Sequence, residues 1–143
     1  MGPRAVLVLA VFAVTAYSCG PPSIDGVLHA DGAALGTWDL EAATCTADQT
    51  GASTVDAPGG GAVPNVRISA GGSGARLEVR GLARTEPVWF GPADCTTLDV
   101  VAIVDGHTSG RAQPAYSVDG HATFDCVTAE GHVRGSVRFQ DCQ

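Results

Sequence analysis

Cysteine and histidine are the side chains in this sequence that could form a chemical site. The chain has 143 residues, with five cysteines and four histidines. Four of the cysteines are widely spaced, and none of them has the Cys-x-x-Cys spacing that is typical of zinc sites. In an exported protein, an even number of such cysteines favours disulfides over a metal centre. We therefore predict two disulfides among Cys45, Cys95, Cys126 and Cys142.

The order of the cysteines along the predicted strands favours one of the three possible pairings. Cys95 precedes an apolar strand at residues 98–104, and Cys126 ends its predicted antiparallel neighbour, so both lie at one end of the sheet. Cys142 ends the last strand and lies at the other end, which leaves it to Cys45. The predicted pairs are Cys95–Cys126 and Cys45–Cys142.

The tetrapeptide Val-Asp-Gly-His occurs twice, at residues 104–107 and 118–121. If the two strands that carry it are antiparallel neighbours, two carboxylates and two imidazoles converge at one end of the sheet, as a metal site needs. The four candidate ligands are Asp105, His107, Asp119 and His121. The alternative is that Asp-Gly forms turns and that each histidine is a solvated strand-end residue. We favour this alternative, and with it the absence of a metal ion or other cofactor.

Motifs of the common hydrolases are missing from the sequence. Ser73, Ser109 and Ser136 lie near glycines, but none is in a Gly-x-Ser-x-Gly motif, and there is no His-Glu-x-x-His. A cysteine nucleophile requires a free thiol, whereas the four candidates are predicted to be oxidised. Residues 71–74 are rich in glycine but lack Gly-Lys-Ser/Thr and precede a strand pattern, which indicates a hairpin turn rather than a phosphate-binding loop. The sequence therefore predicts that the protein is not an enzyme.

The amino-terminal segment has the pattern of an export signal. Arg4 precedes an apolar run at residues 5–16, in which Thr15 is the one polar residue. The run is too short to span a bilayer comfortably and is typical of a secretory signal. It ends in Ala-Tyr-Ser-Cys at Cys19, and this ending resembles the lipobox of bacterial lipoproteins, in which the cysteine is lipidated and becomes the first mature residue.

The resemblance implies a signal peptide at residues 1–18, a lipidated Cys19 and a short tether at residues 19–23. Lipidation also accounts for the odd number of cysteines, since it leaves four for disulfides. Gly20 follows the cysteine in place of an aspartate, so the resemblance implies export to the outer membrane. The alternative is cleavage after Ala16 by the ordinary signal peptidase.

The charge of the chain limits its partners. All fifteen acidic residues lie after Cys19, together with seven of the eight basic residues, so the mature chain has a formal charge of 7 − 15 = −8. This charge argues against a nucleic-acid partner, because nucleic acid binds basic surfaces. It also argues against electrostatic binding to anionic lipids, so that the lipid on Cys19 is the expected attachment to the membrane.

Short segments of strand pattern fill the rest of the chain. Trp38 and Leu40 alternate with polar residues, and Trp38 is predicted to be a core residue. Residues 98–104 are apolar on both parities apart from Asp99, which predicts a central strand covered on both faces. Residues 46–64 show no apolar period and predict a flexible loop. Strands that recur at short intervals between Gly, Pro and Asp turns indicate an all-β fold. We predict a single domain at residues 24–143, a small disulfide-bonded antiparallel β-sandwich or barrel-like meander.

The strongest pattern lies near the carboxy terminus, where residues 118–126 and 133–139 alternate between apolar and polar. If the two segments pair as a hairpin, Asp125 lies opposite Arg134 and His121 lies opposite Arg138. An opposite-charge pair such as the first stabilises a sheet by a few tenths of a kcal/mol up to about 1 kcal/mol. We therefore predict a hairpin with this register.

The order of motifs after Trp89 adds a second resemblance. It runs Pro-Ala-Asp-Cys, an apolar strand, Gly-x-Ala-x-Phe-Asp-Cys and Gly-Ser-Val-x-Phe-x-x-Cys. This order is similar to that of small all-β lipoproteins exported by GC-rich bacteria, myxobacteria included, and the resemblance implies no catalytic residues. The expected function is that of a lipid-anchored, non-enzymatic binding or structural module of the cell envelope, with an envelope protein or glycan as its partner. The alternative is a periplasmic protein that binds a metal or small ligand through the two Val-Asp-Gly-His segments.

Overall fold

The computed structural model describes residues 23–47, 52–56, 63–71, 74–107 and 115–143. Their elements are β1 (Ser23–Asp31), β2 (Trp38–Glu41), β3 (Thr44–Ala47), β4 (Ser53–Asp56), β5 (Asn65–Gly71), β6 (Gly74–Arg80), β7 (Val88–Phe90), the 3-10 turn η1 (Pro92–Asp94), β8 (Cys95–His107), β9 (Ala115–Thr128) and β10 (Gly131–Cys142). In this part of the chain, no helix has the length and apolar character needed to cross a membrane. The predicted signal peptide, the lipidation site Cys19 and most of the tether lie outside the described residues.

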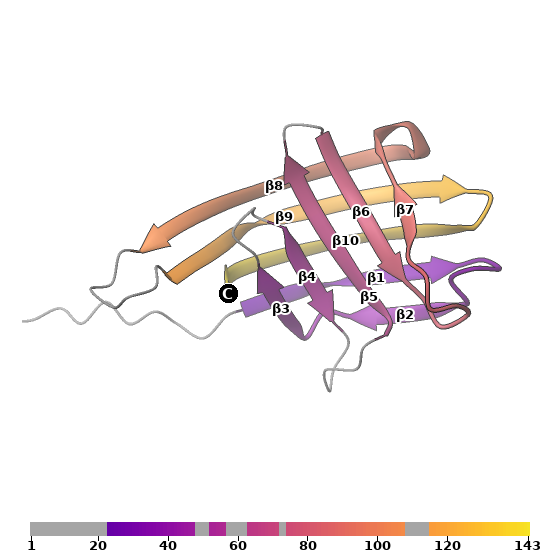
Figure 1. Cartoon of the computed structure of the whole chain (residues 1–143), viewed down its shortest axis with the longest axis horizontal. Coiled ribbons are helices and arrows are strands. Elements are labelled where there is room, and N and C mark those ends of the chain that lie inside the picture. Colours follow the sequence, from indigo (N-terminus) through magenta and orange to yellow (C-terminus); the bar gives the residue numbers. More distant parts are fainter. Residues whose placement is uncertain (1–22, 48–51, 57–62, 72–73, 108–114) are drawn as a thin grey trace, which may run out of the picture.

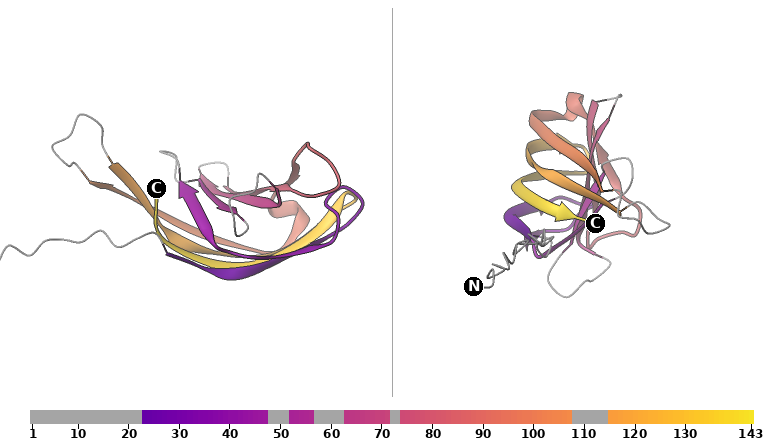
Figure 2. Two further views of the ribbon diagram at one scale, coloured as in Figure 1. Left: turned by 90° about the horizontal axis from the view of Figure 1, so that it is seen from below. Right: turned by 90° about the vertical axis from the view of Figure 1, so that its left-hand side faces the viewer.

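The strands form two five-stranded antiparallel sheets, in the orders β2-β1-β10-β9-β8 and β3-β4-β5-β6-β7. We call them sheet A and sheet B. Sheet A is long and curved, and sheet B lies across its concave side with its strands at a steep angle to those of sheet A (Figure 1, Figure 2). The all-β prediction is confirmed, and of the two architectures that the sequence left open the chain adopts the sandwich.

Alternate residues of the strands fill the space between the two sheets. Trp38 is a core residue, as predicted, with 7% of its surface exposed, and its indole Nε1 donates a hydrogen bond of 3.1 Å to the carbonyl of Leu35. The largest fully buried side chains come from both sheets and from the segment between β1 and β2: Phe90, Phe124, Phe139, Leu28, Leu35, Leu40, Ile68 and Leu77. Since the inward positions belong to the core, the polar residues between them on sheet A form an outer face that points away from sheet B.

The carboxy-terminal hairpin has the predicted register. β9 and β10 pair antiparallel, with Asp125 opposite Arg134 and His121 opposite Arg138. The prediction of a hairpin at residues 71–74 is also confirmed. β5 and β6 pair antiparallel, and the last pair in their register is Gly71 opposite Gly74. Both hairpins were predictable because each connects neighbouring strands through a short turn.

The prediction that residues 98–104 form a central strand is wrong. They belong to β8, which among the described strands pairs only with β9 and is an edge of sheet A. Val101, Ile103 and Val104 expose 38%, 63% and 43% of their surface. The side chains that pack against the core are those of Leu98, Val100 and Ala102. Sheet B covers one face of β8 only, so Val101 and Ile103 on the other face remain exposed. Val104 is on the same face as Leu98, Val100 and Ala102 but is exposed as well.

Residues 46–64 are not one continuous loop, as the sequence suggested. β3 extends to Ala47, and Ser53–Asp56 forms β4, which pairs with β3 on one side and with β5 on the other. A strand of four residues is too short to show a period in the sequence, and it is held by backbone hydrogen bonds to both neighbours. Residues 48–51 and 57–62 of the predicted loop lie outside the described residues.

The two disulfides join the cysteines in the predicted pairs. Cys95 and Cys126 are direct partners in the register of β8 and β9, with their Cα atoms 3.9 Å apart. Cys45 and Cys142 join β3 of sheet B to β10 of sheet A over a sequence separation of 97. The first disulfide therefore fixes an edge strand to its neighbour, and the second links the two sheets.

Candidate functional site

The two Val-Asp-Gly-His segments do not converge. β8 and β9 are antiparallel neighbours, as expected, but Val104 lies opposite Val118. Because the two strands run in opposite directions from this pair, the Asp-Gly-His residues of the two copies extend away from each other. His107 is opposite Ala115, so it lies 121 − 115 = 6 register positions from His121, or about 20 Å along the strands. The convergence of these residues on one metal ion, which was the less favoured interpretation of the sequence, therefore does not occur.

The candidate ligands have separate surroundings. Asp119 Oδ1 accepts a hydrogen bond of 2.6 Å from the backbone N–H of Asp141. His121 Nε2 lies 3.6 Å from Asp99 Oδ2, and Asp105 is an exposed residue of β8. The side chain of the fourth candidate, His107, lies outside the description. Among the residues that the structure describes, no group of three or more His, Cys, Asp or Glu side chains is arranged to hold a metal ion.

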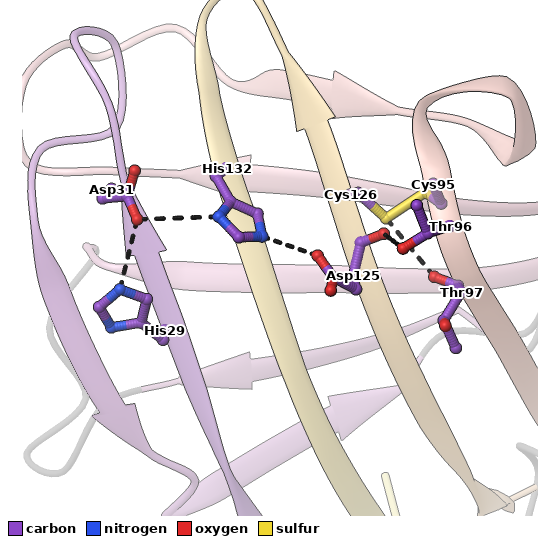
Figure 3. Close-up of polar contacts among 8 residues, drawn as sticks. All are labelled: His29, Asp31, Cys95, Thr96, Thr97, Asp125, Cys126 and His132. Atoms are coloured by element: carbon purple, nitrogen blue, oxygen red, sulfur yellow. Dashed lines mark hydrogen bonds and ion pairs between the residues drawn. A yellow bond between two sulfur atoms is a disulfide. The ribbon is translucent and has the colours of Figure 1, made fainter.

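A different set of histidines and carboxylates comes together on the outer face of sheet A. We call it the carboxylate–imidazole row, and Figure 3 shows all of its members except Asp39. His29 lies opposite Asp39 in the register of β1 and β2, and Asp31 lies opposite His132 in the register of β1 and β10. The row consists of Asp39, His29, Asp31, His132 and Asp125.

Each imidazole in the row uses one nitrogen for a short contact with a carboxylate at the end of the row. His29 Nδ1 lies 2.6 Å from Asp39 Oδ1, and His132 Nε2 lies 2.7 Å from Asp125 Oδ1. The second nitrogen of each ring faces Asp31. The distances to Asp31 Oδ2 are 3.4 Å from His29 Nε2 and 3.8 Å from His132 Nδ1. Carboxylates and imidazoles therefore alternate across the four strands β2, β1, β10 and β9.

The short contacts determine which nitrogen of each neutral imidazole carries the proton. An ionised carboxylate can only accept hydrogen bonds, so the N–H of each ring must point to Asp39 or to Asp125. His29 Nε2 and His132 Nδ1 then carry lone pairs that face the carboxylate of Asp31. When the rings are protonated, the same two nitrogens donate toward Asp31, and the contacts become ion pairs. The side chain of Asp31 is 50% exposed. Asp31 therefore links the two imidazoles at the surface of the sheet.

Arg134 is the cation nearest to the row in the register, where it lies between His29 and Asp125. The position of Arg134 opposite Asp125 was predicted correctly. The favourable charge pair expected between them is not the contact that forms, because the carboxylate of Asp125 bonds to His132 instead. In the described part of the chain, the guanidinium of Arg134 makes no ion pair. The contacts of the row are therefore made between carboxylates and imidazoles, and Arg134 takes no part in them.

An open hollow of about 450 Å³ lies near the row on the same face. Gly26 is part of its lining. This residue has a φ of 149°, and a Cβ there would lie 2.2 Å from the carbonyl oxygen of Ser136, so glycine allows β1 and β10 to lie close together at this point. The hydroxyls of Thr123 and Ser136 are 3.2 Å apart. The lining residues are Asp25, Gly26, His121, Thr123, Ser136, Val137 and Arg138. The outer face of sheet A thus presents two polar features on a rigid sheet.

The carboxylate–imidazole row was missed in the sequence, although part of its signal was there. The predicted hairpin already made Asp125 and His132 diagonal neighbours on one face, which is close enough for long side chains to meet. The pairing of β1 with β2 and with β10 gives no local signal, so the positions of His29 and Asp31 beside these residues could not be predicted.

Known proteins add nothing to this geometry. Comparison of the chain with protein-family models, curated proteins and solved structures finds no match.

Proposed function

We propose that the chain is a lipid-anchored, exported protein of the bacterial cell envelope and acts as a non-enzymatic binding module. Support comes from the secretory signal pattern, from the lipobox-like ending at Cys19 and from a sandwich with two disulfides, which suits an oxidising compartment. By resemblance to other lipoproteins, the outer membrane is the proposed destination. The lipid on Cys19 is the proposed attachment.

The pairing of the cysteines is the observation that carries this proposal. The two disulfides use four of the five cysteines, Cys45 with Cys142 and Cys95 with Cys126. No cysteine of the chain remains as a partner for Cys19. A lipidated cysteine needs no such partner, whereas cleavage after Ala16 would leave an unpaired thiol in an exported protein.

The outer face of sheet A is the proposed binding surface. Its polar side chains stand on paired strands, and rigid elements hold a binding constellation more accurately than loops do. The carboxylate–imidazole row and the hollow near Gly26 lie side by side on this face. The proposed partner is a protein or glycan of the envelope.

Replacement of Cys19 by serine is expected to abolish the lipid anchor. In cells grown with radiolabelled palmitate, the wild-type protein should take up the label and fractionate with membranes. The Cys19→Ser variant should take up none and appear in the soluble fraction, because serine lacks the thiol that is acylated. Ser18→Ala is the matched control, since it keeps a small residue before the cysteine and should be labelled like the wild type. Equal labelling of wild type and Cys19→Ser would refute the anchor.

A further inference from the structure

We propose that two copies of the chain associate through β8, which pairs antiparallel with β8 of the second copy and continues sheet A from one copy into the other. The contact surface is the outer edge of residues 98–104, which we call the β8 edge. The inference goes beyond the proposed function, because it concerns a different surface and a different partner and requires no lipid.

The first argument is that β8 is a long edge strand with little protection. It has 13 residues, whereas the other edge strands, β2, β3 and β7, have four, four and three. Among the described strands, none pairs with its outer side, and Figure 1 shows it as the outermost strand of sheet A. Edge strands often carry lysine, proline or a bulge that prevents further pairing. Residues 98–104 contain no lysine or proline, Asp99 is their charged residue, and the register shift with β9 lies before them.

The second argument is that apolar side chains are exposed on both faces of the β8 edge. Val101 and Ile103 lie on the outer face and expose 38% and 63% of their surface. Val104 lies on the inner face, together with the partly buried Leu98 and Val100, and exposes 43%. A ligand bound on one face of the sheet would cover only one of these sets. A further strand beside β8 brings side chains to both faces and also pairs the edge of the backbone.

The third argument selects a second copy as the partner, because β8 is complementary to itself in one register. Two copies of a strand that are related by a two-fold axis normal to the sheet pair antiparallel. If the axis passes through Val101, this residue lies opposite Val101 of the second copy. Leu98 then lies opposite Val104 of the second copy, and Val100 lies opposite Ala102 of the second copy. Each exposed Val104 is therefore covered by a leucine, and the two exposed Val101 side chains cover each other.

Charge favours this register over the adjacent one. With the axis at Val101, Asp99 lies opposite Ile103 of the second copy, and no two carboxylates of β8 are directly opposite each other. An axis through Ala102 would place Asp99 opposite Asp105 of the second copy at two symmetric positions. Like charges directly opposite each other destabilise a sheet.

The start of the described chain is compatible with this symmetry. Ile24 on β1 lies level with Phe139, Gly120 and Ala102 of the neighbouring strands, one register position from the proposed axis. An axis normal to the sheet places the equivalent residues of both copies at the same height relative to the sheet. Two lipid anchors can therefore enter one membrane, although the pairing itself needs no lipid.

Cysteine cross-linking of the full chain, in the cells that produce it, tests the position of the axis. Val101→Cys places a thiol on the axis, where directly opposite Cα atoms are about 4.5–5.5 Å apart, and a disulfide bridges such a distance. Most of this variant should run as a dimer on a non-reducing gel and as a monomer after reduction. Ile103→Cys is the matched control on the same face. It is more exposed, but it lies four register positions from its counterpart, about 13 Å along the strand, and should remain monomeric. Non-reducing peptide mapping establishes that the two native disulfides are intact.

Sedimentation velocity of the purified full chain in detergent solution tests the pairing without an added cysteine. Val101→Lys places two ammonium groups opposite each other on the axis and should weaken dimerisation by about tenfold. Val27→Lys is the matched control. Val27 is 59% exposed on β1, three strands away from β8 in the order of sheet A, and its replacement should change dimerisation by less than about twofold. Melting temperatures establish that each variant folds. If Val101→Lys does not fold, the cysteine variants decide, since they add no charge.

Three results would overturn the proposal: a wild-type chain that is monomeric at every concentration measured, cross-linking of Ile103→Cys that equals that of Val101→Cys, or equal effects of Val101→Lys and Val27→Lys. A cross-link from Val101→Cys to a different protein would also overturn it and assign the β8 edge to a strand of that protein. Failure of the cross-link leaves the labelling of Cys19 unaffected, and failure of the labelling leaves the pairing of β8 unaffected.

Discussion

Removal of the disulfide between Cys45 and Cys142 is expected to lower the free energy of unfolding by about 4–5 kcal/mol. The bond spans a sequence separation of 97 and joins sheet B to sheet A, so its loss greatly increases the conformational freedom of the unfolded chain. The change is made in the double variant Cys45→Ala/Cys142→Ala. Urea unfolding followed by tryptophan fluorescence measures the effect.

The second disulfide provides the comparison. Cys95→Ala/Cys126→Ala opens a bond with a sequence separation of 31 between two strands that are already neighbours. The expected loss is smaller, about 3–4 kcal/mol, because the closed loop is shorter. A larger loss for this pair than for Cys45 and Cys142 would contradict the role of the long-range bond as the link between the sheets.

Truncation of Phe90 is expected to have an effect of similar size. Phe90 lies on β7 and is 0% exposed, so that Phe90→Ala removes a buried ring and leaves a cavity between the sheets. The expected loss in the free energy of unfolding is about 3–5 kcal/mol. Urea unfolding under the same conditions as for the cysteine variants measures it.

The neighbouring aromatic residue is the control. Trp89 is 47% exposed, and its ring lies 4.3 Å from the guanidinium carbon of Arg76. Trp89→Ala removes this cation–π contact and little buried area, so the expected loss is below about 1 kcal/mol. Because Trp89 contributes to the fluorescence signal, circular dichroism follows the unfolding of both variants. Equal losses for the two substitutions would contradict the inward direction of Phe90.

The sequence allowed the local part of the fold to be predicted. The register of β9 and β10 was correct to the residue, because a short turn joins the strands and each strand alternates cleanly. The disulfide pairs were also correct although β8 was misplaced as a central strand. Their prediction required only that β8 and β9 be neighbours and that Cys142 lie at the other end of the sheet.

The parts that failed depend on contacts between distant segments. Nothing in residues 98–104 indicates whether another strand covers them, and the edge position of β8 follows from the order of the whole sheet. The same holds for the site. His29 and Asp31 meet His132 only because β1 and β10, which lie at opposite ends of the domain sequence, are paired. The repeated Val-Asp-Gly-His was conspicuous in the sequence, but antiparallel pairing about Val104 and Val118 directs its two copies away from each other.

The intact mass of the protein isolated from the cells that produce it tests the central claim most directly. A lipid-anchored module with two disulfides should give the mass of a chain that begins at Cys19, increased by its acyl groups, and should contain no thiol that reacts with iodoacetamide before reduction. A chain that begins at Tyr17, carries no lipid and has a reactive thiol would contradict the account.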